Sequence, residues 1–353
     1  MSREILEAMV RDGEVIGRER HFGGMNLAGA DLSGTIFEGT DFANADLRGA
    51  NFRESLLTRV RFDGADLTGA DLTQASFTEC SMTHARLGGV KAPMWNAINC
   101  GMRGAVLARA ELTVANIMQS RLTRASFAEA NLIKARIVKC RTDGIDLRGA
   151  VCEDAAFIEA DLREAAIANT RFHRTVFFAG HFAGRSLQGV TMPLCQFTEC
   201  DVTGCDFSGA DLTQAGMQKV KAAGARFENA RMPKAILMEA QMQGAVLRGA
   251  DLSNAVLSGA DLTEADATGA RLYQAICVGM KAPRARFGQC DMTYADLSHA
   301  ELEQADLAGT TLTRANLHMI RDAGARIPDR RGALPPDQDR AQAEQWQQRW
   351  AGR

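Results

Sequence analysis

The chain has 353 residues, of which 46% are apolar and 24% charged, proportions that are ordinary for a soluble protein. Its 41 basic and 43 acidic residues give a formal charge of −2, which argues against a uniformly basic nucleic-acid binder and against a strongly acidic imitator of nucleic acid. No stretch approaches the roughly 18 apolar residues of a membrane span, and the N-terminus lacks the apolar run of a signal peptide. We therefore expect a cytoplasmic protein with no membrane partner.

The first segment, residues 1–21, precedes any repeat. Within it, Ser2–Arg11 can form a short helix with Ile5, Leu6, Met9 and Val10 on one side. We expect this helix to cap the domain that follows.

A repeat of five residues dominates the chain from Phe22 to Leu317. Of the 60 positions in that frame, 52 are Leu, Phe, Met, Ile or Val, and no insertion shifts the phase. A small residue, usually alanine, lies two positions before each of these centres, and most of the 33 glycines lie two positions after one. The centres that depart from the pattern are Ala92, Ala97, Thr142, Cys152, Ala222, Ala267, Cys277 and Ala282.

A period of five fits neither an α-helix nor an ordinary strand, so it indicates a stacked array. One large and one small inward position in every five require the chain to turn a corner every five residues. Four such corners make a coil of about twenty residues, and neighbouring coils stack by backbone hydrogen bonds about 4.8 Å apart. Sixty pentapeptides then predict about fifteen coils. Glycine after the centre provides the positive φ of a type II-like corner, with Asn44, Asn169, Asn229 and Asn254 as substitutes.

Segments such as ADLSG, ADLRGANF, ADLTGADLTQASF and ADLSNAVLSGADLTEAD resemble the pentapeptide-repeat family. The resemblance extends over residues 22–325 and implies an all-β fold, a right-handed quadrilateral β-helix. It also implies binding of other macromolecules, which is what most members do. One branch of the family resembles DNA in shape and charge and binds DNA gyrase.

All nine cysteines lie on inward positions. We expect buried, reduced thiols that act as small apolar residues. Cys80 and Cys100 lie one coil apart, a separation that a disulfide could span, although a reducing cytosol disfavours that bond. Cys195, Cys200 and Cys205 are spaced like a metal cluster, but a five-residue spacing places them at three successive corners.

The six histidines all lie on outward positions. Only His299 and His318 are near neighbours, almost one coil apart, and the sequence shows no third ligand beside them. No nucleophile, base and orienting carboxylate form a motif, and no glycine-rich phosphate loop is present. The sequence therefore predicts no metal site, no cofactor and no catalytic activity.

Charge is unevenly distributed along the repeats. Between Thr83 and Thr142, ten basic residues face two acidic ones, a balance of +8. Coils of twenty residues place Arg103, Arg121, Arg124 and Arg141 on one face. These arginines either keep the surface soluble or bind an acidic partner.

The repeat is least regular in three segments: KAPMWNAIN from Lys91, VFFAGHFAGRSLQGVTMPLCQ from Val176, and MKAPR from Met280. Each is either a local kink or bulge, or a contact site. In the second interpretation, Trp95 and Phe178 are exposed and bind a partner.

Residues 326–353 differ from the repeats. A proline-containing linker follows Ile327, and Arg340–Trp350 is helical in character, with Trp346 and Trp350 on an apolar stripe. This amphipathic helix either caps the last coil or docks on a partner, and a second copy of the chain could be held by either terminal segment.

The sequence favours a non-catalytic scaffold or adaptor that binds protein partners on the faces of a rod-shaped β-solenoid. The segment GRERHFGGMNLAGADLSG also resembles the junction before pentapeptide repeats in bacterial secretion-associated proteins, which implies an adaptor of type VI secretion. The alternative is a DNA-mimicking modulator of DNA gyrase or another topoisomerase, as the family resemblance suggests. The +8 segment fits such a mimic poorly, and we do not expect direct nucleic-acid binding.

Overall fold

The computed structural model describes residues 3–18, 20–328, 330–335 and 337–351, with the side chains of residues 345–351 outside the described part. The chain divides into two compact units, Met1–His181 and Phe182–Arg353. The boundary falls inside the irregular segment that begins at Val176. No helix in the described ranges is both long enough and apolar enough to span a bilayer.

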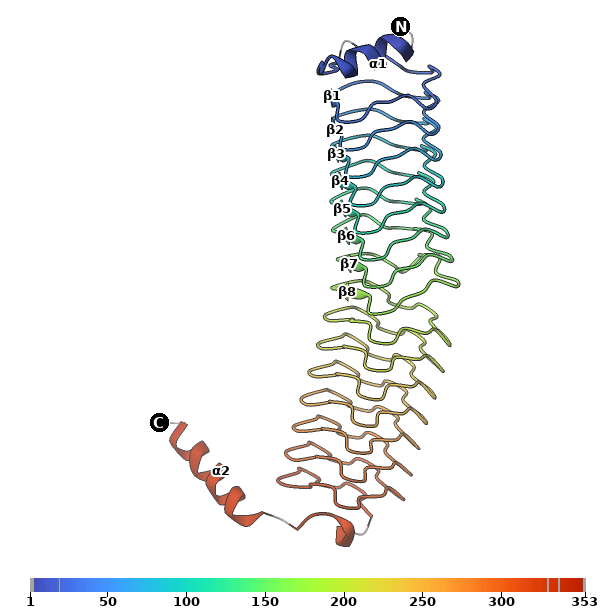
Figure 1. Ribbon diagram of the computed structural model, residues 1–353. Helices are drawn as coiled ribbons and strands as arrows, with labels where there is room; N and C mark the ends of the chain where they lie inside the picture. Colours follow the sequence, from blue (N-terminus) through green and yellow to red (C-terminus); the bar gives the residue numbers. More distant parts are fainter. Residues whose placement is uncertain (1–2, 19, 329, 336, 352–353) are drawn as a thin grey trace. The chain divides into compact units, whose positions relative to one another are not determined.

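The first unit carries one regular sheet on one of its faces (Figure 1). All neighbouring strands are parallel and shifted by twenty residues, so that Phe37 lies opposite Leu57, and Leu57 opposite Phe77. The sheet order is the chain order. The eight strands are β1 (Ile36–Glu38), β2 (Leu56–Thr58), β3 (Ser76–Thr78), β4 (Asn96–Ile98), β5 (Asn116–Met118), β6 (Arg136–Val138), β7 (Ala156–Ile158) and β8 (Val176–Phe178).

The other three faces pair through single bridges with the same twenty-residue shift, and every face of the second unit does likewise. Four faces per twenty residues form the predicted all-β quadrilateral solenoid. The sequence predicts about fifteen coils for all sixty pentapeptides. The regular sheet, from β1 to β8, accounts for only about seven turns. The difference arises because the pentapeptides beyond Phe178 pair through isolated bridges, from Ser186 with Asp206 to Asp306 with Arg326, and form no further strand among the described residues.

The core runs through the interior of the coils. All 60 predicted centres are buried except Ile167 and Leu317, which are half-buried. Phenylalanines stack directly above one another: the ring centroids of Phe22 and Phe42 are 5.2 Å apart, and those of Phe42 and Phe62 5.3 Å. The one polar centre, Thr142, satisfies its buried hydroxyl by donating to the Asp161 carbonyl at 2.8 Å. Each coil therefore buries its apolar side chains against the next coil, which is what stabilises a repeat too small to fold alone.

The nine cysteines are all buried and free, as predicted. Cys80, Cys100 and Cys140 follow one corner of the first unit, where Thr40 and Ser120 occupy equivalent positions. Each of these five side chains donates to a backbone carbonyl 23 or 24 residues earlier, in the preceding coil. The thiols thus share with the hydroxyls a structural role, because both link successive coils.

The N-terminal end is covered by α1 (Arg3–Arg11), close to the predicted helix. Leu6 and Met9 are buried, whereas Ile5 is 51% exposed and does not belong to the apolar side as expected. Arg3 donates to the carbonyls of Ala28 and Gly29, both at 2.7 Å, and Glu7 accepts the Asp31 backbone N–H at 3.0 Å. The helix therefore uses backbone groups that the first coil would otherwise leave unpaired.

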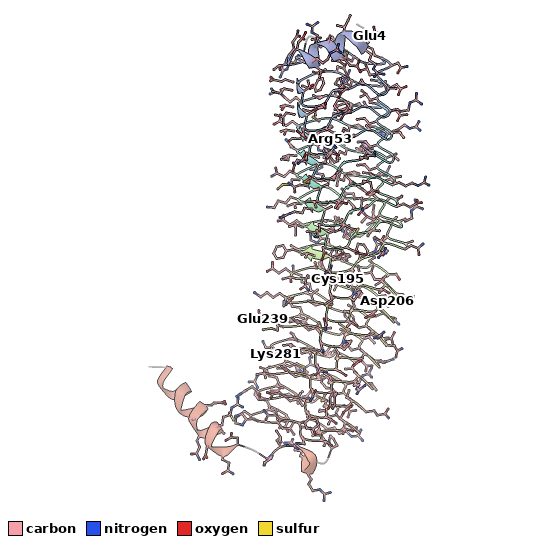
Figure 2. All side chains as sticks on the ribbon, viewed as in Figure 1. Glu4, Arg53, Cys195, Asp206, Glu239 and Lys281 are labelled. Atoms are coloured by element: carbon pink, nitrogen blue, oxygen red, sulfur yellow. The ribbon has the colours of Figure 1, made fainter. Side chains whose placement is uncertain are left out.

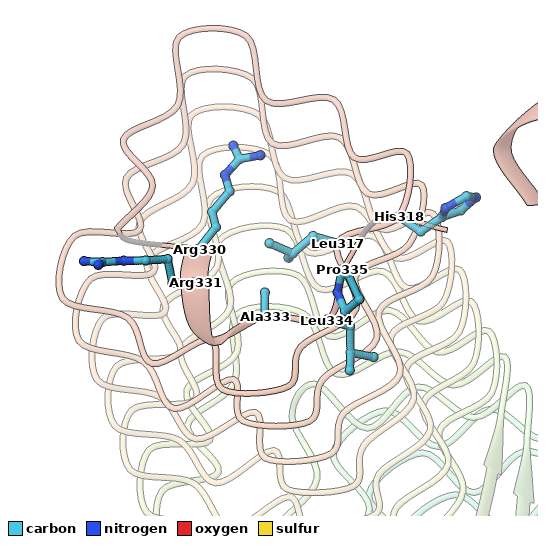
Figure 3. Close-up of a pocket in the computed structure, with 7 residues that line it drawn as sticks. All are labelled: Leu317, His318, Arg330, Arg331, Ala333, Leu334 and Pro335. Atoms are coloured by element: carbon cyan, nitrogen blue, oxygen red, sulfur yellow. The ribbon is translucent and has the colours of Figure 1, made fainter. Parts of the chain in front are cut away.

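The second unit ends with the short 3₁₀ helix η1 (Arg330–Gly332) and with α2 (Gln338–Ala351), where the sequence predicts a helix. The segment 330–334 covers the open end of the last coil: Arg314 N–H donates to the Gly332 carbonyl at 2.6 Å, and Leu334 N–H to the Ala315 carbonyl at 2.9 Å. Between this segment and the coil lies a cavity of about 430 Å³, whose lining includes Leu317, Ala333 and Leu334 (Figure 3). The linker, rather than α2, closes this end.

Candidate functional site

Four arginines form a basic band on one face of the first unit. We define the basic band as Arg103, Arg121, Arg124 and Arg141, which the pentapeptides 101–105, 121–125 and 141–145 present in successive coils. The backbone register places Gly101 beside Arg121 and Arg121 beside Arg141. All four arginines are exposed. The predicted grouping on one face is therefore what the structure shows.

The arginines of the band differ from other arginines on the same face in how they are paired. On the same face, Arg61 donates from Nε and from one Nη atom to the two carboxylate oxygens of Asp41, and Arg163 pairs with Asp161 in the same way. Those contacts hold the pKa of each carboxyl below its usual range, mainly through the hydrogen bond from the arginine. Within the described ranges, the structure shows no ion pair for any arginine of the basic band.

Carboxylates border the band on its C-terminal side. Asp143, Asp161 and Glu164, together with Arg163, line a shallow cavity of about 320 Å³. The nearest of these carboxylates, Asp143, accepts a hydrogen bond from Thr123 Oγ1 at 3.4 Å rather than from an arginine. Coils about 4.8 Å apart bring the guanidinium groups close together, so these like charges repel one another.

Trp95 is not exposed, so its predicted role in binding a partner is wrong. Its exposed fraction is 0%, and its ring meets the edge of Phe77 at a centroid distance of 5.5 Å. Trp95 occupies an inward position normally held by alanine, while the neighbouring centres are Ala92 and Ala97. The two small centres make room for the indole, so the irregular segment exchanges large and small residues without leaving the core.

Phe178 is 37% exposed, at the end of β8, on a different face from the basic band. The structure does not bring Phe178 and the four arginines together into one site. The side chains of Trp346 and Trp350 lie outside the described part of the chain. Binding of a partner by any of these three residues stays a prediction.

Sequence reasoning missed one neighbour of the paired histidines. Glu344, on α2, places its Oε2 atom 3.2 Å from the Nε2 atoms of both His299 and His318. The carboxylate lies outside the repeat frame, so no spacing rule could have connected it with the two histidines. The signal that was available is compositional, since Glu344 is one of few acidic residues after the linker.

Four-faced coils with a buried apolar residue at every fifth position define a β-solenoid repeat protein. The family model for pentapeptide repeats matches residues 26–64, 55–91, 143–177, 181–214, 195–232, 240–276 and 283–320, which together cover more than half of the chain. The chain belongs to the pentapeptide-repeat family, as the sequence predicts. Curated protein sequences include no match to it.

Solved structures of the same family are similar to this chain. HetL, involved in heterocyst differentiation regulation in the cyanobacterium Nostoc sp. strain PCC 7120, is 21% identical over 78% of this chain and 97% of its own, with a TM-score of 0.27. The plasmid-mediated fluoroquinolone resistance protein QnrB1 is 18% identical over 56% of this chain and 90% of its own, with a TM-score of 0.31. A pentapeptide repeat protein of the Arabidopsis thaliana thylakoid lumen is 28% identical over 31% and 71%, with a TM-score of 0.25.

Proposed function

We propose that this protein is a non-catalytic scaffold whose basic band binds an acidic surface of a protein partner. The observation that carries the proposal is the contrast on a single face, where Arg61 and Arg163 have carboxylate partners and the four arginines of the band have none in the described ranges. The repeat requires only inward residues, so nothing in the fold demands arginine at these outward positions. Clustered charges without counter-ions attract an oppositely charged surface and guide its approach.

Other features of the chain support a binding role. Pentapeptide-repeat proteins are generally structural or binding proteins. The DNA-mimic alternative calls for carboxylates along the whole length, whereas this chain carries a formal charge of only −2 and a basic band. Within the scaffold class, the resemblance of residues 17–34 to a secretion-associated junction supports an adaptor of bacterial type VI secretion as the specific role.

The test uses poly-L-glutamate as a probe of acidic surfaces. We expect the intact protein to bind it at low salt and to lose affinity as the NaCl concentration rises, because salt screens exposed charges. The double substitution Arg121→Glu with Arg141→Glu should weaken binding roughly tenfold or more, equivalent to about 1.4 kcal/mol. The melting temperature should change little, since both side chains are exposed.

A matched control comes from the neighbouring faces. Lys134→Glu with Arg136→Glu makes the same change in charge at exposed positions outside the band, and should leave binding largely intact. Equal losses in both double variants would show a diffuse charge effect and overturn the proposal. A short DNA duplex that binds more tightly than poly-L-glutamate would also overturn it, in favour of a nucleic-acid partner.

A further inference from the structure

Three possible metal ligands converge where α2 meets the coils of the second unit. The Glu344 Oε2 atom lies 3.2 Å from His299 Nε2 and 3.2 Å from His318 Nε2, and the three ligand atoms all lie within 4.8 Å of one another. The imidazole rings are nearly perpendicular, at 82°, with centroids 5.5 Å apart. Different ring planes let two imidazoles aim their Nε2 atoms at one point.

The histidine pair is built by the coil itself. Residues 299 and 318 lie in adjacent coils, joined by a hydrogen bond of 2.8 Å from His299 N–H to the His318 carbonyl. The His318 backbone N–H also donates to Asn316 Oδ1 at 3.1 Å. In Figure 3 the His318 ring points outward, away from Leu317. Although this position faces outward in the repeat, the His318 side chain is only 5% exposed.

The carboxylate is held from its other side. Arg340, one turn earlier on α2, donates from Nε to Glu344 Oε1 at 2.8 Å. Oε1 is thereby occupied, and Oε2 alone faces the imidazoles. Such support of a ligating carboxylate by an outer partner is usual in metal sites, where it orients the ligand.

We propose that His299, His318 and Glu344 form a Zn²⁺ site with a solvent molecule as the fourth ligand. Two histidines and one carboxylate are a ligand set that zinc accepts, with bonds of about 2.0–2.2 Å. Tetrahedral bonds of that length separate neighbouring ligand atoms by about 3.3–3.6 Å, close to the two distances of 3.2 Å. A small displacement of Glu344 therefore suffices to admit the ion. Imidazole nitrogens favour Zn²⁺ over Mg²⁺ or Ca²⁺, which prefer oxygen ligands.

The site would join α2 to the coils. The Glu344 carboxylate connects α2 to the coils through its contacts with both histidines. A metal ion shared by the helix and the coils would strengthen this junction. The C-terminal helix would then be held on the solenoid when zinc is bound and released when the ion is removed.

The first experiment measures metal binding by the untagged, full-length chain after dialysis against EDTA. We expect one Zn²⁺ per chain by calorimetry and by elemental analysis after gel filtration. Co²⁺ should replace it and give the visible absorption of a four-coordinate site. Because the nine thiols are buried, we expect none of them to bind the cobalt ion. A cobalt–thiolate charge-transfer band would show that a cysteine binds it instead, and would count against the site.

Substitutions then test the ligands. His299→Ala and Glu344→Gln should each weaken Zn²⁺ binding at least about 100-fold, because loss of a mere outer-shell partner already costs about 10–100-fold. His318 is buried and its substitution could unfold the coil, so it is not used. His84→Ala and Glu264→Gln, exposed residues elsewhere in the repeat, serve as controls and should bind as the parent does.

Two outcomes overturn the proposal. If the parent chain retains no Zn²⁺, or if His299→Ala and Glu344→Gln bind it unchanged, the cluster is only a set of hydrogen-bonding contacts. Because the basic band lies in the other unit, poly-L-glutamate binding should be unaffected by these variants. Failure of the zinc proposal would therefore leave the proposed function untouched, and the reverse also holds.

Discussion

Left-handed backbone geometry two residues after each centre is the most demanding condition that the coil imposes on single residues. Among the described residues, 37 that are not glycine adopt φ values of +49° to +61°, including Val114, Leu194 and Tyr294. A left-handed residue other than glycine costs roughly 1–2 kcal/mol. The sequence pattern predicts this geometry only at glycine and asparagine. The coil imposes it on other residues because the cooperative stacking of neighbours outweighs the local cost.

Trp95 shows how the same core can be filled in a second way. The period of five predicts the inward direction of residue 95, but a tryptophan there contradicts the expectation of a small residue. Only the structure shows that Ala92 and Ala97 leave the space that the indole fills. Volume compensation between neighbouring corners depends on packing in three dimensions, so the sequence left open an exposed Trp95, and the structure shows a buried one.

A pair of substitutions tests that packing. Trp95→Ala should destabilise the first unit by about 3–5 kcal/mol, the range for deleting a large buried ring. Trp95→Phe should cost much less, because it keeps most of the volume and removes an indole N–H that has no hydrogen-bond partner in the described part of the chain. Chemical denaturation followed by circular dichroism measures both. Similar small losses in the two variants would place Trp95 at the surface after all.

At the scale of elements, side chains at twenty-residue spacing form ladders between adjacent coils. Asp266 is the most buried carboxylate of such a ladder, with its side chain 9% exposed, and it accepts from Arg248 at 2.7 Å and from Arg286 at 2.6 Å. Burial alone would raise the pKa of Asp266, but hydrogen bonds from Thr268 and Arg248, with the charge of Arg286, outweigh it and lower that pKa well below the usual value.

The sign of this shift sets a pH dependence. A carboxyl whose pKa is lowered by folding stabilises the protein above its unfolded pKa, and that contribution is lost as the pH falls below about 4. Asp266→Asn should therefore lower the free energy of unfolding by about 2 kcal/mol at pH 7 and reduce its loss on acidification. Denaturant melts at pH 7 and at about pH 2.5, below the usual pKa of an aspartate, measure both effects.

Asp251→Asn is the matched control for Asp266. Asp251 accepts the same local hydrogen bonds, from the backbone N–H and hydroxyl of Ser253, but the described residues give it no ion pair. A loss of stability as large as that of Asp266→Asn would assign the effect to the turn rather than to the two arginines.

For the terminal helices, the sequence predicts the position in the chain but not the contacts. Both terminal helices lie close to where periodicity places them, because an apolar stripe is a local property of the sequence. What each helix contacts is not local. The approach of Glu344 to His299 and His318 depends on the path of a non-repeating linker, and the closure of the last coil by Gly332 and Leu334 has no counterpart in the repeat.

At the scale of the whole molecule, the repeat is uninterrupted in sequence although the chain forms two compact units. Each unit buries its own column of centres, and each non-repeat end is used to satisfy exposed backbone groups. Buried cysteines lie in the cores of both units, four before His181 and five after it. Their reactivity therefore reports on the integrity of each unit by the same chemistry.

The last prediction concerns these nine thiols. Burial raises the pKa of Cys140 and Cys205 to about 11 and that of Cys277 and Cys290 to about 12. The neighbouring Cys100 thiol, together with burial, also raises the pKa of Cys80, whereas the Cys80 thiol lowers the pKa of Cys100. Because all nine thiols are buried, a thiol reagent cannot reach them in the folded protein, so they should react slowly at pH 8 and rapidly in denaturant.

Mass spectrometry of the labelled peptides assigns the rates to individual residues and so to each unit. Nine thiols should be counted after denaturation without reductant. A count of seven, with Cys80 and Cys100 missing, would show a disulfide between these adjacent coils. Rapid labelling without denaturant at cysteines of one unit, with the other protected, would show that its core opens independently. Rapid labelling throughout would contradict the inward assignment on which the whole solenoid depends, because a thiol on a centre or a corner position cannot reach solvent while the coils remain stacked.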